Sequence, residues 1–295
     1  MPETIVDRLR DSGRPTFSVE FFPPSDDAGV QQLIGSVDAL GPLAPDWVSV
    51  TYGATGASRY KTFAAVGAIR GTTDARLIGH LTVAGQSLGE IRRALDAYRR
   101  LGVTHVLALR GDPPGGGAFE AHPDGFINAT ELVRFIKGYG DFTVGVAAFP
   151  NPHPEGSSDL DARILLAKEE AGAEFAVTQM FFDAQTYVGM VGRFRDLGGT
   201  MPVVAGIMPI TAHSQIERFA GLSGAALPER VVRSLTAVAD DKDAFRAAGL
   251  DLVTDLCADV LAAGAPGLQF FTLNRSTATA EILGRLRAEA VAAAS

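Results

Sequence analysis

The sequence predicts an α/β fold, a (βα)8 TIM barrel with extra helices before the eighth strand. Short β-rich runs alternate with longer, helix-patterned segments eight times along the 295 residues. Most of the runs are continuously apolar, which is typical of parallel strands that are buried on both faces. No linker or change of composition interrupts the alternation, so we expect residues 1–295 to form a single barrel domain.

The strands follow from these apolar runs. In chain order they are expected at TFSVEFF (16–22), DWVSVTYG (46–53), RLIGHLTV (76–83), HVLALRGD (105–112), TVGVAAFP (143–150), FAVTQMFFD (175–183), PVVAGIMPI (202–210) and LQFFTLN (268–274). An open, doubly wound sheet is the alternative arrangement. That fold would require a glycine-rich turn after the first strand, where this chain has FFPPSDD (21–27).

The helices follow from apolar residues at spacings of three and four. In SLGEIRRALDAYRRLG (87–102) these residues are Leu88, Ile91, Leu95 and Tyr98. Ser87 is a suitable N-cap, and Gly102 marks the end of the helix. Segment 184–199 repeats the pattern, and the long interval 211–267 is expected to hold the extra helices.

Composition and charge exclude several classes of function. The chain is 46% hydrophobic and 20% charged, as globular proteins are. Its net charge of −8 and pI of about 5.2 argue against a nucleic-acid or acidic-membrane partner. Cys257 is the only cysteine, which excludes internal disulfides and thiolate metal clusters. The N-terminus lacks an apolar signal-peptide region and no run of about 18 apolar residues occurs, so we expect a soluble, cytoplasmic protein.

Polar residues gather at the expected carboxyl ends of the strands, where TIM barrels hold active sites. The first is Glu20, a carboxylate within the apolar run FSVEFFPP (17–24). Glutamate is rarely buried without a partner, so Glu20 either has a structural hydrogen-bond or ion-pair partner or has a catalytic role. The other polar residues at the strand ends favour a catalytic role. The other polar residues at these ends are Ser49, Thr51, Tyr52, His80, Thr82, Arg110, Asp112, Asn151, His153, Gln179, Asp183, Thr272, Asn274 and Arg275.

The sequence lacks the residues that several catalytic mechanisms require. The four lysines lie outside the predicted strands, so no Schiff-base nucleophile is expected. The five histidines do not cluster at metal-ligand spacing, so we expect no metal; a centre built on His80 and His153 is the less favoured alternative. There is no GxSxG elbow and no P-loop. The remaining acids, amides and aromatic rings suit a planar, polar heterocycle and proton-assisted redox or ring-opening chemistry.

Eight motifs stand in order at the strand ends: FSVEFFPP (17–24), SVTYGA (49–54), GHLT (79–82), ALRGDPP (108–114), AAFPNPHPE (147–155), AVTQMFFD (176–183), GIMPI (206–210) and FFTLNR (270–275). Together they resemble the 5,10-methylenetetrahydrofolate reductase family over about residues 16–275. The resemblance implies a TIM barrel that reduces methylenetetrahydrofolate to 5-methyltetrahydrofolate with a nicotinamide cofactor. It also implies a single catalytic domain without the regulatory extension of longer eukaryotic members.

The resemblance implies roles for two acids. The imidazolidine ring of the substrate must open to a 5-iminium cation before it accepts hydride, and N10 must leave as a neutral amine. Glu20 matches the family's general acid, and its burial among phenylalanines should raise the pKa of its carboxyl toward the working pH. Asp112 matches the acid beside the pterin, where a carboxylate favours the cation.

The resemblance also implies residues that bind the substrate. Gln179 matches an amide on the pterin edge, and Arg275 matches an arginine on the same rim. Gln215 and Phe219 match a loop whose aromatic ring packs on folate or nicotinamide, with ordinary helix packing as the alternative for Phe219. Trp47 is expected to be core. The hydride donor is NADH or NADPH, with NADH favoured, and the sequence does not predict an oligomeric state.

Most family members carry FAD, and the resemblance implies flavin contacts from Thr51, His80, Leu109, Arg110, Asp112, Ala148, His153, Asp161 and Lys168. Four positions depart from the family pattern: Asn128 and Phe149 stand where tyrosine is usual, and Ile164 and Leu166 stand where polar residues are usual. Each lost charge-assisted hydrogen bond is worth about 1.5–3 kcal/mol, so such losses weaken FAD binding by orders of magnitude.

Three hypotheses about the reaction therefore stay open. Hydride passes directly from the nicotinamide to the iminium carbon without flavin, or the protein is an ordinary FAD-dependent ping-pong reductase. The least favoured is a folate-binding barrel that has lost catalysis, since a mere binder has no need of a buried acid beside N10.

Overall fold

Eight parallel strands close into a barrel in the computed structural model of the chain, which describes residues 4–11, 13–52, 56–113, 117–153, 156–215 and 227–293. The strands follow one another in chain order, and β1 pairs with β8 to complete the ring. Their bounds are β1 (Thr16–Phe21), β2 (Trp47–Val50), β3 (Arg76–Thr82), β4 (His105–Leu109), β5 (Thr143–Ala148), β6 (Phe175–Thr178), β7 (Val203–Ile207) and β8 (Gly267–Phe271). The predicted TIM barrel is confirmed.

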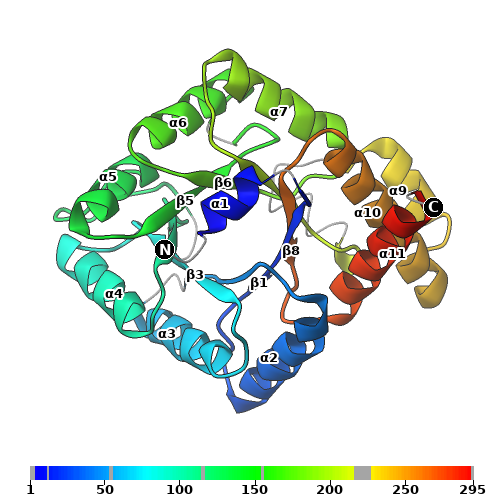
Figure 1. Cartoon of the computed structure of the whole chain (residues 1–295), viewed down its shortest axis with the longest axis horizontal. Helices are drawn as coiled ribbons and strands as arrows, with labels where there is room; N and C mark the ends of the chain where they lie inside the picture. Colours follow the sequence, from blue (N-terminus) through cyan, green and yellow to red (C-terminus); the bar gives the residue numbers. More distant parts are fainter. Residues whose placement is uncertain are drawn as a thin grey trace.

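Most of the helices form a ring around the strands, and the first helix lies over the middle of that ring (Figure 1). Their bounds are α1 (Ile5–Arg10), α2 (Asp27–Leu40), the 3-10 turn η1 (Gly41–Leu43), α3 (Gly56–Arg70), α4 (Leu88–Arg100), α5 (Ala129–Tyr139), α6 (Ser158–Glu170), α7 (Ala184–Asp196), α9 (Glu229–Thr236), α10 (Lys242–Ala262) and α11 (Thr277–Ala293). The expected extra helices before β8 are confirmed by α9 and α10. Ser87 is the N-cap of α4, as its position predicted, and it also forms a capping box with Glu90.

All eight strands end before the predicted runs do. In the sixth run, for example, β6 ends at Thr178, yet Met180, Phe181 and Phe182 remain buried beyond it. These residues belong to the large core between the strands and the helices. Apolar sequence therefore reports burial, which continues past the last ladder hydrogen bond, and this explains the overlong predictions.

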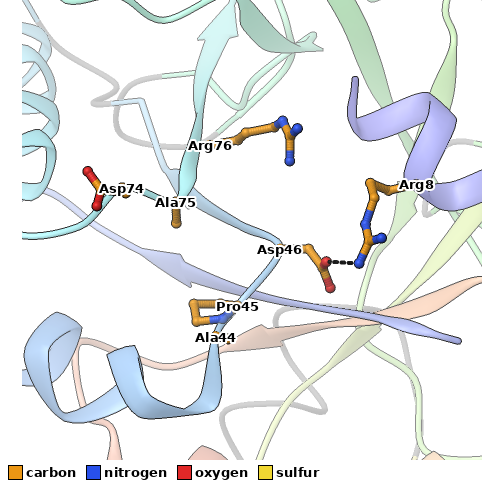
Figure 2. Close-up of a pocket in the computed structure, with 7 residues that line it drawn as sticks. All are labelled: Arg8, Ala44, Pro45, Asp46, Asp74, Ala75 and Arg76. Atoms are coloured by element: carbon orange, nitrogen blue, oxygen red, sulfur yellow. Dashed lines mark hydrogen bonds and ion pairs between the residues drawn. The ribbon is translucent and has the colours of Figure 1, made fainter. Parts of the chain in front are cut away.

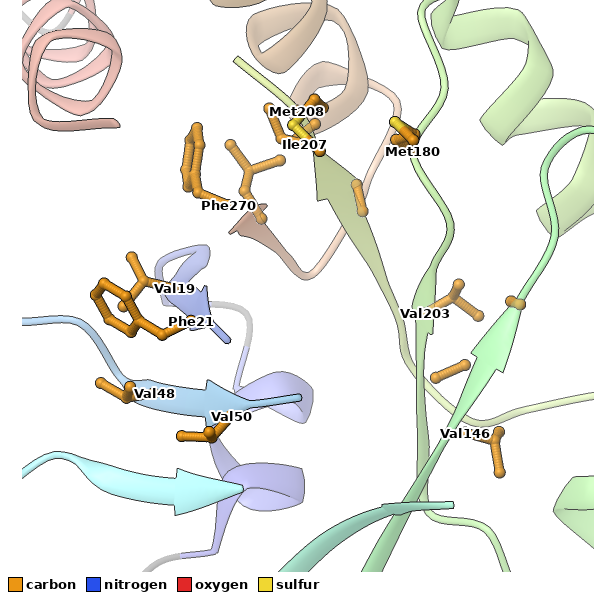
Figure 3. Packing of buried hydrophobic residues seen from close by; sticks show 14 of the residues in the cluster. Val19, Phe21, Val48, Val50, Val146, Met180, Val203, Ile207, Met208 and Phe270 are labelled. Atoms are coloured by element: carbon orange, nitrogen blue, oxygen red, sulfur yellow. The ribbon is translucent and has the colours of Figure 1, made fainter. Parts of the chain in front are cut away.

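Alternate residues of each strand face two separate cores. Outward-facing side chains such as Val19, Phe21 and Phe270 pack in the large cluster beneath the helices (Figure 3). A smaller cluster fills the barrel interior, and its strand residues are Trp47, Ile78, Leu107, Phe175, Val177 and Val204. Apolar residues of α1, among them Ile5 and Leu9, join this inner cluster. The first helix therefore closes the amino end of the barrel and leaves the carboxyl end for the site (Figure 1).

The register of β1 with its neighbours determines what surrounds Glu20. Ser18 is level with Trp47 on β2 and with Gln269 on β8. Two residues further along β1, Glu20 is level with Ser49 and Phe271. Because side chains alternate, Glu20 points into the barrel one layer nearer the carboxyl end than Trp47 and Gln269.

Helix α4 holds β3 in place behind the site. Tyr98 is fully buried, and its hydroxyl donates to the backbone carbonyl of His80 at 2.6 Å. Its ring lies so close to Gly79 that a Cβ there would approach the ring atoms to 2.3 Å. Only glycine therefore permits this contact, which fixes the part of β3 that carries His80.

Candidate active site

A cavity of about 330 Å³ opens at the carboxyl ends of the strands. Its walls come from β1, β3, β4, β5, β6 and β8 and from the loops that follow the strands. The lining residues are Glu20, Thr51, Tyr52, His80, Thr82, Leu107, Leu109, Gly111, Asp112, Ala147, Phe149, Val177, Thr178, Gln179 and Phe271. The predicted residues Glu20, Thr51, His80, Leu109, Asp112 and Gln179 are thus brought together, at the end of the barrel where function was expected.

Glu20 lies at the inner wall of this cavity, with 15% of its side chain exposed. Its Oε2 accepts a hydrogen bond from Gln269 Nε2 at 2.9 Å and a longer one from Ser49 Oγ at 3.5 Å. Burial raises the pKa of Glu20 to about 8, against the opposing effect of these two donors. The carboxyl is therefore largely protonated at neutral pH, as a general acid must be.

His80 stands beside Glu20 without forming an ion pair with it. Its Nε2 lies 3.4 Å from Glu20 Oε2, and this nitrogen is buried with no hydrogen-bond partner in the described part of the chain. Burial lowers the pKa of His80 to about 3, so the imidazole is neutral. Two uncharged groups therefore face each other, and the proton on Glu20 is not held by a neighbouring charge.

Asp112 has a different environment from Glu20. It lines the cavity from the loop after β4 and is exposed to solvent. Gly111 carries the chain over the rim with a φ of +77°, and a Cβ there would lie 2.7 Å from Thr82. Glycine therefore permits the close turn that brings Asp112 to the cavity. A largely buried acid and an exposed acid therefore share the cavity.

The residues predicted to bind folate are only partly gathered at the cavity. Gln179 lines it, although its Oε1 also accepts from the Met180 backbone N–H at 2.9 Å. Gln215 does not line it; its Oε1 accepts from the backbone N–H groups of Thr211 and Ala212 and so stabilises the loop after β7. Arg275 is exposed on the rim after β8. Phe219 lies outside the described residues, so its predicted contact stays a prediction.

Predicted flavin-binding side chains near β5 and α6 are engaged with one another. Lys168 Nζ is buried, donates to the Ala147 carbonyl at 2.8 Å and lies 6.0 Å from the centre of the Phe149 ring. Burial lowers the pKa of Lys168 to about 8. Asp161 accepts from the backbone N–H of His153 at 2.9 Å, and the His153 ring meets Phe149 edge-on. These groups stabilise the connection between β5 and α6.

Three of the four departing residues, at positions 128, 164 and 166, do not line the cavity. Asn128 is the N-cap of α5, and its side chain accepts from the Glu131 N–H at 3.0 Å. Leu166 packs against the outer core, and Ile164 is an exposed aliphatic side chain. Among the residues that the structure describes here, position 128 offers no aromatic platform, and positions 164 and 166 offer no polar group for a diphosphate. The described part of this side does not fit a flavin dinucleotide.

The other predicted flavin contacts differ in where their side chains lie. Thr51, His80 and Leu109 line the cavity. Ala148 packs in the outer core, and the guanidinium of Arg110 lies 5.3 Å from the centre of the Phe119 ring. Their binding roles stay predictions.

A second cavity, of about 490 Å³, lies at the opposite end of the barrel (Figure 2). It is lined by Arg8 of α1 and by residues that precede or begin β2 and β3, including Asp46 and Arg76. Asp46 pairs with Arg8 at 3.1 Å and with Arg14 at 2.8 Å. Its charges therefore join α1 and the segment before β1 to the barrel, and the predicted catalytic residues all lie at the other end.

Sequence reasoning missed Gln269 and Phe271 of β8. Both point toward the layer of Glu20, and Gln269 makes the shortest hydrogen bond to its carboxyl. The available signal was a glutamine inside the apolar run GLQFF (267–271), the same anomaly that singled out Glu20. The sequence singled out Phe149 only as a departure from the family pattern, whereas this residue forms part of the cavity wall.

A family model described as methylenetetrahydrofolate reductase matches residues 5–287 of this chain. The chain belongs to the methylenetetrahydrofolate reductase family. Curated relatives of this family of oxidoreductases include methylenetetrahydrofolate reductase 1 of Schizosaccharomyces pombe, 35% identical over 92% of this chain and 46% of its own length. Methylenetetrahydrofolate reductase (NADH) 1 of Zea mays is 34% identical over 96% of this chain and 50% of its own length. The 5,10-methylenetetrahydrofolate reductase of Escherichia coli K12 is 34% identical over 90% of this chain and 88% of its own length.

The chain thus spans about half the length of these eukaryotic relatives and corresponds to most of the bacterial one. Among solved structures, a Clostridium thermocellum protein described as binding two copies of 5-methyl-5,6,7,8-tetrahydrofolic acid superposes with a TM-score of 0.64 at 12% identity, over 96% of this chain and 97% of its own. Dihydropteroate synthase from Xanthomonas albilineans superposes with a TM-score of 0.52 at 18% identity, over 94% and 93%. At such identities these likenesses show the fold alone. None of the helices in the described ranges combines the length and apolarity needed to cross a bilayer.

Proposed function

We propose that this chain reduces 5,10-methylenetetrahydrofolate to 5-methyltetrahydrofolate with hydride from NADH. The observation that carries the proposal is the buried carboxyl of Glu20, which opens onto the cavity and has a pKa of about 8. Membership of the reductase family supports the reaction. The choice of NADH is supported by plant relatives that are named as NADH enzymes.

In the first step, Glu20 transfers its proton to N10 of the substrate. The bond between N10 and the bridging carbon breaks, N10 leaves as a neutral amine, and the carbon becomes part of a 5-iminium cation. An acid with a pKa near the working pH suits this step, because it is protonated before transfer and releases the proton readily. The ionised Glu20 is afterwards reprotonated from solvent through the open cavity.

The second step is hydride transfer to the iminium carbon, which yields the 5-methyl group and oxidised nicotinamide. A carboxylate at Asp112 beside the cavity stabilises the cation before hydride arrives. Gln179 offers both a donor and an acceptor to the edge of the pterin. Phe149 and Phe271 supply apolar walls that suit planar rings.

We further propose that the nicotinamide transfers hydride directly to the folate. The support is the engagement of Lys168 by the Ala147 carbonyl and the Phe149 ring, together with the apolar side chains at positions 164 and 166. These groups do not fit a flavin diphosphate, so no step is assigned to flavin. The nicotinamide ring then occupies the same cavity as the pterin.

The test follows nicotinamide absorbance with purified protein and methylenetetrahydrofolate, with and without added FAD, after the visible spectrum of the protein has been recorded. Turnover by colourless protein that FAD does not change is the expected result. Turnover only with FAD would reject direct transfer and keep the reductase. Absence of turnover under both conditions, with folate still bound, would reject catalysis and leave a folate-binding barrel.

A further inference from the structure

Two buried residues beneath Glu20 form a chain of hydrogen bonds that ends on its carboxyl. Trp47 Nε1 donates to Gln269 Oε1 at 3.2 Å, and Gln269 Nε2 donates to Glu20 Oε2 at 2.9 Å. Trp47 is fully buried and Gln269 is 1% exposed. The three residues come from β2, β8 and β1, three neighbouring strands of the closed barrel. This series of hydrogen bonds therefore depends on the closure of the barrel between β8 and β1.

The direction of these hydrogen bonds is fixed, because an indole N–H can only donate. Gln269 must turn its carbonyl oxygen toward Trp47, and its NH2 group then faces Glu20. The reversed amide would turn its NH2 group toward the Trp47 N–H and leave that buried indole donor unpaired, which is costly. Trp47 thus determines that Glu20 meets a donor and not an acceptor.

We propose that Trp47 and Gln269 are positioning residues that keep one carboxyl oxygen of Glu20 occupied as an acceptor and so hold its transferable proton on Oε1, the other oxygen. This inference deepens the proposed function and rests on Glu20 acting there as an acid. The donors on Oε2 are Gln269 and Ser49. A carboxyl that receives donors on one oxygen keeps its proton on the other, where substrate N10 can receive it.

Other titratable groups lie beside Glu20 or line the same cavity. His80 on β3 is neutral, and its Nε2 makes no hydrogen bond to Oε2 within the described residues. Tyr52 and Asp112 line the same cavity from the loops after β2 and β4. The chain through Gln269 is distinct from these groups because it approaches Glu20 from the closed interior of the barrel, which substrate does not reach.

The test titrates Glu20 in the full-length protein by infrared difference spectroscopy, which needs no turnover. The C=O stretch of protonated Glu20 is assigned by its loss in Glu20→Gln, and its midpoint is compared across variants. Gln269→Met removes a donor that favours the ionised form, so the midpoint should rise by about one pH unit. Trp47→Phe keeps an aromatic ring but frees the amide to reverse, so a smaller rise is expected.

Tyr187→Phe is the matched control. It also removes one buried aromatic donor, whose hydroxyl bonds the Val203 carbonyl at 2.8 Å, but it lies between α7 and β7, in the outer core. We expect this variant to lower the melting temperature and leave the Glu20 midpoint unchanged. In the double variant Trp47→Phe, Gln269→Met, the midpoint should match that of Gln269→Met alone, because Trp47 acts through the amide.

The inference is overturned if Trp47→Phe behaves like Tyr187→Phe, with a change in stability and none in the midpoint. It is also overturned if the two shifts add in the double variant. If Trp47→Phe does not fold, an unchanged Glu20 midpoint in Gln269→Met overturns the inference instead. Failure of the proposed function is recognised separately, since wild-type protein would then show no nicotinamide oxidation while the infrared titration still reports on Glu20.

Discussion

Glu20 is expected to make the folded protein less stable as pH rises, and Glu20→Gln should remove this effect. The pKa of the carboxyl is raised from its ordinary value of 4.5 to about 8 because it is buried. Between these two values the folded state holds a proton that the unfolded state has lost, so the free energy of unfolding falls with increasing pH. The contribution is complete below pH 4.5 and is lost as pH passes 8.

The size of the effect follows from the two pKa values. Each pH unit between them lowers the free energy of unfolding by about 1.4 kcal/mol, so the whole interval amounts to about 5 kcal/mol. Between pH 5 and 9 the expected loss is about 4 kcal/mol. This is a large share of the stability of an ordinary domain. The acid that suits proton transfer is therefore costly to keep in place.

The assay is urea unfolding of wild-type and Glu20→Gln proteins at several values between pH 5 and 9. The difference in unfolding free energy between the two proteins should grow in favour of Glu20→Gln by about 4 kcal/mol across this range. Glu120→Gln, which removes an exposed carboxyl, is the matched control and should run parallel to wild type. Parallel curves for wild type and Glu20→Gln would refute the reasoning, because a carboxyl without a desolvation cost produces no such divergence.

Three further predictions concern activity and the rim. Turnover of wild-type protein should decline as pH rises through about 8, where Glu20 loses its proton, as a pH profile of the rate will show. In Glu20→Gln, kcat should fall by about 10²–10⁴-fold while folate affinity measured by calorimetry changes little; an unchanged kcat contradicts the assigned role. Asn274 Oδ1 accepts a hydrogen bond from the Phe22 backbone N–H, and Asn274 Nδ2 donates one to the Phe22 carbonyl, both at 2.9 Å. Asn274→Ala should therefore lower the free energy of unfolding, measured with urea, by about 1–3 kcal/mol. Leu273→Gly is the control for Asn274→Ala and should lower the free energy of unfolding little or not at all, because Leu273 has a φ of +50°, which glycine readily adopts.

Much of the site was predictable because Glu20 violates the pattern of its own strand. An acid in a continuous apolar run has few purely structural explanations. The active sites of TIM barrels lie at the carboxyl ends of the strands, and this predicts the end at which Glu20 acts. Asp112, Thr51, His80 and Gln179 were predicted to share the rim for the same reason, and they line one cavity.

What the sequence did not predict depends on contacts between distant segments. Gln269 reaches Glu20 only because β8 closes on β1 in a particular register, although the two residues are 249 positions apart in the chain. Trp47 was correctly expected to be buried, but the direction in which its N–H donates is a property of the folded barrel. The inward position of Lys168 likewise reflects its partners Ala147 and Phe149, which spacing along α6 does not reveal.

The central claim, direct reduction of the folate by nicotinamide, is tested most directly with NADH that carries deuterium at the transferred position of C4. Colourless, flavin-free protein should convert methylenetetrahydrofolate to a product with one deuterium in its 5-methyl group, detected by mass spectrometry and NMR. Reduced flavin exchanges its N5 hydrogen with water, so an unlabelled methyl group formed by protein with bound flavin would contradict the account.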